Sequence, residues 1–212
     1  MRLDHLSYAA GPEGLASTTL RLAELLGEKF WDGGVHPRFG TRNMVLPLAN
    51  RQYLEVVEVL DHPASDKAPF GQLVRRRSEC GGGWLGWVVA VGDISPVEVR
   101  LGRSAVEGNR YRPDGVDLRW RQVGVMGMQT DPELPFFVQW MVPPEDHPST
   151  GATGDVALIK LEIAGDPARL RHWLGATPDA PLDHVDVEWT TPQGTPGVVA
   201  AHFATPEGVV RI

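Results

Sequence analysis

The chain has a single cysteine, Cys80, among its 212 residues. One cysteine cannot form an intramolecular disulfide or a cysteine-rich zinc site, and this is typical of a protein from a reducing compartment. Residues 1–10 lack the long apolar stretch of a signal peptide. We therefore expect a cytoplasmic protein.

Long apolar runs and basic clusters are missing as well. No segment approaches the roughly 20 apolar residues that span a bilayer, so we expect no membrane partner. The formal net charge is -7, and the longest basic run, Arg75–Arg77, is interpreted as a solvated loop. Nucleic acid is not an expected partner, because phosphate backbones are bound by clustered lysine and arginine.

Glycine and proline are abundant, with 24 and 18 residues, and most of them separate short apolar runs. Many short strands joined by tight turns are therefore predicted. The predicted order of strand, helix and two or three strands occurs three times, and each helix ends at a Leu-Gly pair, at Gly27, Gly102 and Gly175. An α+β fold of repeated βαβββ modules, each roughly 60 residues long, is the simplest description.

Hydrophobic alternation and turn residues set the expected boundaries. Strands are predicted at 3–10, 41–48, 52–60, 84–91, 116–125, 136–142, 156–164, 184–190, 198–204 and 209–212. The Pro/Ser/Thr/Gly stretch 143–154 is the best boundary candidate. We expect one domain over 1–150, with modules at about 1–62 and 81–142, and an additional C-terminal βαβββ-like module at 154–212.

Several short motifs occur in one order along the first 150 residues or so: LDHL at 3–6, HPRFGTRN at 36–43, YLEVVEV at 53–59, RPDG at 112–115, and FFVQW at 136–140 followed by His147-Pro148. With these motifs the chain resembles the vicinal oxygen chelate superfamily, and within it the glyoxalase-like proteins. The resemblance implies two βαβββ modules whose curved mixed sheets enclose a cup. It also implies a divalent metal, held by His or Gln on the first strand and Glu on the last strand of each module, which chelates two oxygens of the substrate.

Strand alternation supports part of such a site, because His5, Asn43 and Glu55 lie on the polar faces of their strands. We expect them to converge in the cup, with the donor atoms of His5 and Glu55 about 3–5 Å apart. His5 and Glu55 are the candidate ligands of one iron, manganese, nickel or zinc ion. The second module would place Gly86 and Gln139 at the corresponding positions, so a cup without metal, in which His5 and Glu55 hydrogen-bond each other or a loop, is the alternative.

Further candidates are expected around the cup. Glu55 and His36 are the candidate catalytic residues, His36 because histidine titrates near neutrality. The candidate substrate-binding residues are Asn43, Arg112, Gln139 and His147. Arg112 would bind a carboxylate or phosphate, or else would pair with Asp114 or Asp117.

Two functions remain open at this point. The first is a metal-assisted isomerase, lyase or dioxygenase for a small oxygen-rich compound, which the His5/Glu55 pair favours. The second is a protein that binds or sequesters a small molecule without chemistry, which Gly86 and Gln139 favour. The expected partner in both is a small polar or anionic molecule, and a homodimer is a further expectation.

Overall fold

A computed structural model describes residues 1–175, 184–190 and 196–212 of the chain. Its first module consists of β1 (Arg2–Ala9), α1 (Gly14–Leu26), β2 (Trp31–His36), β3 (Thr41–Leu48) and β4 (Gln52–Val59). Gly27 ends α1 at a φ of 71°, a left-handed conformation that glycine adopts without steric cost. Asn50 and Arg51 both have positive φ and connect β3 to β4, as expected for a tight hairpin turn.

The second module repeats this order. It consists of β5 (Gly83–Ala90), α4 (Ser95–Leu101), β6 (Val106–Tyr111), β7 (Asp117–Val123) and β8 (Phe136–Trp140), with the 3-10 helix η1 (Val125–Gln129) before β8. Strand β6 was not among the predicted strands, because its sequence VEGNRY lacks an alternating apolar pattern. The two modules therefore have the predicted βαβββ order.

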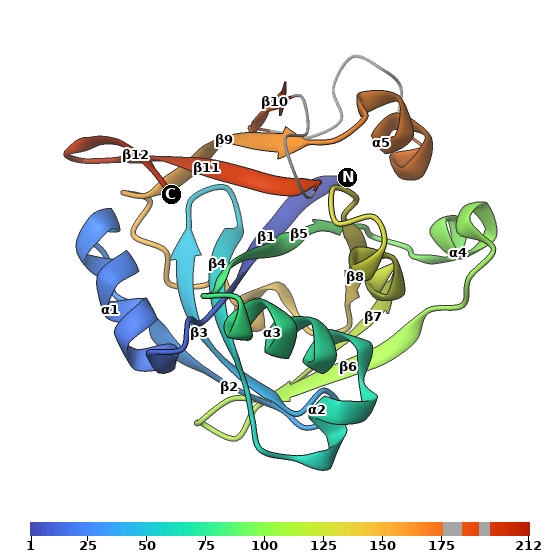
Figure 1. The fold of residues 1–212 in the computed structure, drawn as a ribbon, viewed down its shortest axis with the longest axis horizontal. Coiled ribbons are helices and arrows are strands. Elements are labelled where there is room, and N and C mark those ends of the chain that lie inside the picture. Colours follow the sequence, from blue (N-terminus) through green and yellow to red (C-terminus); the bar gives the residue numbers. More distant parts are fainter. Residues whose placement is uncertain (176–183, 191–195) are drawn as a thin grey trace.

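The eight strands of the two modules form one closed barrel in the order β1-β4-β3-β2-β6-β7-β8-β5. In each module the first strand runs parallel to the last, β1 with β4 and β5 with β8. The modules join by antiparallel pairing of β1 with β5 and by a bridge between Val35 and Tyr111. The strands surround a central space, with α1 and α4 on opposite outer sides (Figure 1). The predicted α+β fold with a cup of curved mixed sheets is confirmed.

The segment between the modules contains two helices that sequence patterns do not predict, α2 (Pro63–Lys67) and α3 (Pro69–Glu79). Arg75–Arg77 lies on α3, so its interpretation as a loop was wrong. Phe70 and Val74 of α3 pack among side chains of the barrel wall such as Val88. Figure 1 shows α3 lying across one end of the barrel. This helix therefore covers the mouth of the cup.

The C-terminal unit consists of β9 (Ala157–Ala164), α5 (Pro167–Leu174), β10 (Asp186–Thr190), β11 (Gly197–Thr205) and β12 (Gly208–Arg211). Asp166 caps α5 by accepting a hydrogen bond from the backbone N–H of Ala168 at 2.8 Å. The element order is the predicted one, but the sheet order is β10-β9-β11-β12. The first strand of this unit lies between the second and the third, whereas in the cup modules it lies beside the fourth. The unit is therefore not a third copy of the cup module.

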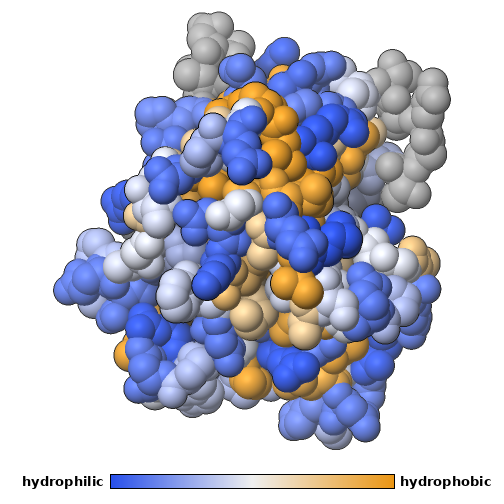
Figure 2. Space-filling model, turned by 90° about the vertical axis from the view of Figure 1, so that its left-hand side faces the viewer, coloured by the Kyte–Doolittle hydropathy of each residue, from blue (hydrophilic) through white to orange (hydrophobic). Residues whose placement is uncertain are grey.

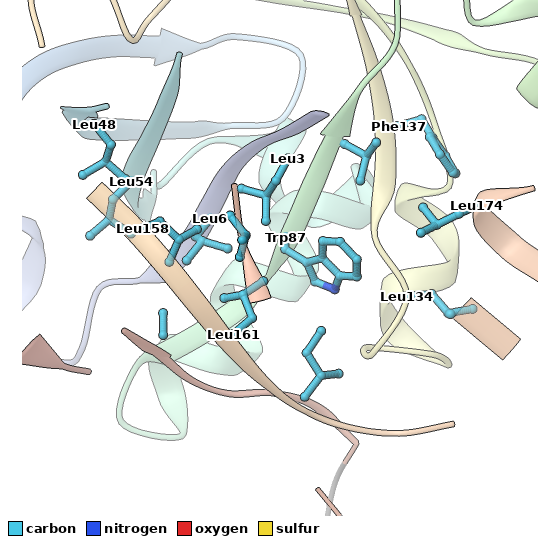
Figure 3. Close-up of a cluster of buried hydrophobic side chains, with 14 of the residues drawn as sticks. Leu3, Leu6, Leu48, Leu54, Trp87, Leu134, Phe137, Leu158, Leu161 and Leu174 are labelled. Atoms are coloured by element: carbon cyan, nitrogen blue, oxygen red, sulfur yellow. The ribbon is translucent and has the colours of Figure 1, made fainter. Parts of the chain in front are cut away.

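One hydrophobic core joins the barrel to the C-terminal sheet. Leu6 of β1 and Trp87 of β5 are fully buried against Leu161 of β9 and Phe203 of β11. Figure 3 shows Leu158 and Leu161 beside Leu6, with Trp87 in the same cluster. The apolar faces of β1 and β5 therefore turn outward to this sheet, and their other faces are left for the inside of the cup. The division at residues 150–154 stays a prediction.

The surface is mixed in character. Hydrophobic residues gather in the upper half of the face in Figure 2, at the height of the C-terminal sheet, and hydrophilic residues border them. None of the helices within the described residues is long and apolar enough to span a membrane.

Candidate functional site

A cavity of about 40 Å³ lies inside the barrel. This volume accommodates a few water molecules or a small ligand group. Its walls differ in character: the first module supplies polar side chains, and the second supplies mostly aromatic and aliphatic ones. The lining residues are His5, His36, Phe39, Tyr53, Glu55, Phe70, Arg110, Trp120, Gln122, Phe136, Val138 and Trp140.

A bulge in β1 brings Asp4 and His5 together. Neighbouring strand residues normally point to opposite faces, but the register of β1 against β5 shifts between Leu3 and His5, which re-aims the side chains there. Nδ1 of His5 donates a hydrogen bond to Oδ2 of Asp4 at 3.0 Å. The carboxylate can only accept, so it fixes the proton on Nδ1 and leaves Nε2 facing away from Asp4.

Asp4 is fully buried, accepts three hydrogen bonds and forms an ion pair with Arg2. Oδ2 also accepts from Nε1 of Trp140 at 3.0 Å, and Oδ1 receives Nη2 of Arg2 at 2.8 Å and Nε2 of His147 at 3.2 Å. Burial acts to raise the pKa of Asp4, but the hydrogen bonds and charges of His147 and His5 hold that pKa well below its ordinary value. Asp4 is therefore a charged anchor that fixes the orientation of His5.

The imidazole of His5 is fixed on its faces and edges as well. It stacks on Tyr53 with ring centroids 4.3 Å apart, and it meets Phe136 edge-on at 6.2 Å. Its Nε2 lies 3.7 Å from Oε1 of Glu55. This separation falls within the roughly 3–5 Å expected between two ligands of one metal ion, and both side chains line the cavity.

Glu55 is held by neutral donors from two neighbouring strands. Oε1 accepts from the hydroxyl of Ser7 at 2.6 Å, and Oε2 accepts from Nδ2 of Asn43 at 2.7 Å. Burial acts to raise the pKa of Glu55, but the nearby His5 and His36 and the two hydrogen bonds lower it below its ordinary value. Glu55 is therefore a carboxylate at neutral pH.

Asn43 links Glu55 to a buried cation. Its Oδ1 accepts from Nη1 of Arg110 at 3.2 Å, while its Nδ2 donates to Glu55. Only one orientation of the amide satisfies both contacts. Arg110 is 3% exposed, and its Nε has no hydrogen-bond partner in the described part of the chain.

His36 is a buried histidine that stays neutral. Its Nδ1 lies 3.2 Å from the hydroxyl of Thr41. Burial lowers the pKa of His36 to about 4, with a further lowering from the positive charge of Arg110. At neutral pH this imidazole can donate a hydrogen bond to a ligand or accept one from it, but it carries no charge.

Comparison with known proteins places this geometry in a family. A family model described as a glyoxalase-like domain matches residues 3–177. The chain belongs to the glyoxalase-like domain family. This match and the fold confirm the resemblance to the vicinal oxygen chelate superfamily.

Solved structures share the fold of this glyoxalase-like domain at low sequence identity. A hypothetical protein from Staphylococcus aureus is 16% identical, with 99% of this chain and 98% of that chain covered and a TM-score of 0.69. Methylmalonyl-CoA epimerase from Mycobacterium tuberculosis is 14% identical, with 66% and 86% covered and a TM-score of 0.43. No curated protein matches the sequence. The likeness to the Staphylococcus aureus protein shows the fold alone.

None of the four predicted substrate-binding residues of the glyoxalase-like domain lines the cavity, and Asn43 contributes only by holding Glu55 and Arg110, which do. Nε2 of Gln139 donates to the carbonyl of Gly92 at 3.0 Å, and Oε1 accepts from the backbone N–H of Ile94 at 3.3 Å. The cavity is lined instead by Val138 and Trp140. The register expected for Gln139 was therefore wrong by one residue, because β8 is apolar on both faces and its alternation does not show which face points inward.

Arg112 and His147 also stand away from the cavity. Arg112 forms ion pairs with Asp114 and Asp146 at the rim of an outer groove, which was the alternative considered for it. His147 donates through Nε2 to Asp4, and its Nδ1 accepts from the backbone N–H of Ser149 at 3.2 Å. His147 therefore supports Asp4 and does not line the cup.

Sequence reasoning missed Asp4, Ser7 and Arg110 as parts of the site. Ser7 shares the polar face of His5, and that alternation could have found it. Asp4 depends on a bulge, and Arg110 lies on the unpredicted strand β6, so neither had a signal in the hydrophobic pattern. Trp120 and Trp140 do line the cavity.

The residues present do not fit the metal site that the superfamily resemblance implies. Strand pairing places Val88 opposite His5 and Gly86 opposite Ser7, so the second module supplies no ligand from its first strand. Within the described residues, no group of three or more His, Cys, Asp or Glu side chains could hold a metal ion. Both oxygens of Glu55 already accept hydrogen bonds. His5 and Glu55 alone fall short of the three or four protein ligands that are usual for zinc.

Proposed function

We propose that the cup binds a small oxygen-rich compound and transfers a proton on it, as an isomerase or lyase does. The observation that carries this proposal is that His5 lies between two carboxylates, with the buried Asp4 behind it and Glu55 beside it in the cavity wall. Nδ1 of His5 is committed to Asp4 at 3.0 Å, while Nε2 lies in the cavity, 3.7 Å from Glu55. A base held by a buried carboxylate is the arrangement that activates histidine in many enzymes.

The proposed step begins with neutral His5. Its Nε2 takes a proton from a carbon next to a carbonyl group, and the electron pair of the broken C–H bond moves onto the carbonyl oxygen. The imidazolium that forms lies between the carboxylates of Asp4 and Glu55, which stabilise its charge. His5 then returns the proton to a different atom of the enolate in an isomerisation.

Two further residues support this step. His36 lines the same cavity and has a pKa of about 4, so it is neutral at pH 7 and is suited to hydrogen-bond the carbonyl oxygen. Glu55 is fixed by Ser7 and Asn43, which suits a carboxylate that stabilises a cation better than one that moves. His5 is therefore the proposed base, with Glu55 and His36 as its partners.

Binding without chemistry is the second candidate function. The observation that favours it is the opposite wall, where Phe136, Val138 and Trp140 provide contact area but no acid or base. A sequestering protein would need only such a shaped, mostly apolar cavity with a few polar anchors. Metal-assisted chemistry stays a prediction, and His5 and Glu55 are too few ligands to support it well. Metal analysis of protein purified without chelator or His-tag tests it.

Hydrogen exchange in D₂O separates the two candidates without knowledge of the product. We expect the protein to accelerate the loss of the α-carbon proton signal of 2-oxobutyrate or phenylpyruvate, followed by ¹H NMR. The His5→Asn variant should lose about 100-fold or more of the acceleration, the usual contribution of a general base. The matched control is His172→Asn, because His172 is exposed on α5, and it should behave as the wild type.

Two outcomes would overturn the proposed function. One is His5→Asn exchanging protons as fast as the wild type. The other is tight binding of either compound, measured by calorimetry, with exchange no faster than in buffer. The second result would establish binding without chemistry.

A further inference from the structure

Arg110 is a buried cation with no carboxylate in direct contact among the described residues, although Glu55 and Asp32 are near enough to act on its charge. The residue is 3% exposed, and within the described residues no Asp or Glu oxygen lies within 4.0 Å of its guanidinium. Its hydrogen bond from Nη1 to Asn43 uses one of five N–H donors, and Nε is buried with no partner in the same part of the chain. Buried charges are normally paired, because an isolated one is strongly unfavourable.

Arg110 lies where its positive charge can reach a ligand inside the cup. Arg110 lines the inner cavity together with His5, His36 and Glu55. It also lines the outer groove, and no other residue is shared by the two. The groove is lined by three carboxylates, those of Asp32, Glu145 and Asp146, and by a second cation, Arg112, which is already paired with Asp146. The remaining negative charge disfavours an anion there. The inner side is therefore the side that an anionic group would occupy.

We infer that Arg110 is an anion subsite of the cup and that the compound it takes is a small carboxylate with an apolar tail. A carboxylate matches the planar fork of a guanidinium. A phosphate would bring up to two negative charges beside Glu55, and like charges in a buried site repel strongly. The tail would lie on Phe136 and Val138, apolar side chains that line the same cavity. This inference rests on the proposed function only in placing the ligand in the same cavity.

Equilibrium binding tests the subsite independently of any chemistry. The probes are butyrate and butyramide, which have nearly the same shape and differ in charge, with inorganic phosphate as a third probe. We expect butyrate to raise the melting temperature of the wild type in a concentration-dependent way, with smaller or no shifts from butyramide and phosphate. His5→Asn should keep the shift with butyrate, because it leaves Arg110 in place.

Variants at Arg110 should separate a ligand-binding role from a structural one. Arg110→Met removes the charge at similar length, and we expect it to abolish the butyrate shift. Its melting temperature without ligand should be at least that of the wild type, because removing an unpaired buried charge offsets the lost bond to Asn43. Arg110→Lys keeps the charge without the fork and should weaken butyrate binding about tenfold or more. Arg38→Met is the matched control, since Arg38 is 55% exposed.

The outcomes are distinguishable. Loss of proton exchange with an intact butyrate shift would remove the proposed function and leave the subsite standing. The inference would be overturned by equal shifts from butyrate and butyramide, by a larger shift from phosphate, by an unchanged shift in Arg110→Met, or by no shift in the wild type. A large fall in the melting temperature of both Arg110 variants would assign the residue a structural role and overturn it as well.

Discussion

Replacement of Asp4 by asparagine should destabilise the protein strongly. Each oxygen of Asp4 has two N–H partners: Oδ2 accepts from His5 and Trp140, and Oδ1 accepts from His147 and forms an ion pair with Arg2. The carboxamide that this substitution introduces would have to turn its NH₂ group toward two N–H donors in either orientation. Asp4→Asn therefore loses two hydrogen bonds and leaves buried donors without partners.

The expected magnitude follows from the burial of Asp4, which has no exposed surface. Removing one partner of a buried charged network costs about 3–5 kcal/mol. For a chain of this size each kcal/mol shifts the melting temperature by about 2–4 °C, so the variant should melt about 6–20 °C lower. Urea unfolding followed by tryptophan fluorescence, together with thermal unfolding by circular dichroism, measures both quantities. The control Asp66→Asn changes an aspartate that is 69% exposed and should cost less than about 1 kcal/mol.

The pH dependence of this difference has a definite sign. Because the folded pKa of Asp4 lies below its ordinary value of 3.8, the carboxylate contributes stability above that pH and loses it as the pH falls further. The advantage of the wild type over Asp4→Asn should therefore be constant above about pH 5 and shrink below 3.8. A loss smaller than about 1 kcal/mol at pH 7, or a difference that grows on acidification, would refute the role of Asp4 as a charged anchor.

Other perturbations have equally definite expectations. Burial lowers the pKa of His36 from 6.5 to about 4, so the free energy of unfolding should fall by about 3 kcal/mol as the pH drops from 6.5 to about 4. In His36→Asn, urea unfolding at a series of pH values should show a smaller fall. Glu55→Gln should cost only about 1 kcal/mol at pH 7, because the Ser7 hydroxyl can turn to accept from the new amide, and the difference should disappear below the ordinary glutamate pKa of 4.5. Phe203→Ala should lower the free energy of unfolding by about 3–5 kcal/mol. Because Phe203 joins the C-terminal sheet to the barrel, calorimetry should show both unfolding in one transition at a lower temperature.

Strand alternation was enough to assemble half of the site from the sequence. His5, Asn43 and Glu55 each lie on a strand whose other face is apolar, so the period of two assigns them to the cup without knowledge of the topology. The structure brings them together, with Nε2 of His5 3.7 Å from Oε1 of Glu55. The same reasoning failed for Gln139, because Phe136 and Phe137 place apolar side chains on both faces of β8.

The remaining parts of the site depend on features that hydrophobic periodicity does not encode. Asp4 reaches His5 only because the register of β1 slips against β5, and such a bulge depends on the partner strand as much as on the residues themselves. Arg110 lies on a strand with little apolar character that is held by pairing with β7. The helices α2 and α3 begin at Pro63 and Pro69, a local start signal, and α3 is fixed by packing across the barrel mouth.

The two modules of the cup line the cavity with different side chains, so the two sides of the cavity are not equivalent. Position by position, His5 of β1 pairs with Val88 of β5, and the wall carrying Glu55 faces one carrying Val138. A cup with the same ligands in both halves suits a central metal, whereas a cup whose proposed base and acidic residue both lie in one half orients an unsymmetrical molecule. The proposed carboxylate would be held by Arg110 of β6 and its tail by Phe136 and Val138 of β8, while His5 and Glu55 of the first module line the same cavity. The asymmetry that removes a four-ligand metal site therefore also selects which end of a small molecule meets the base.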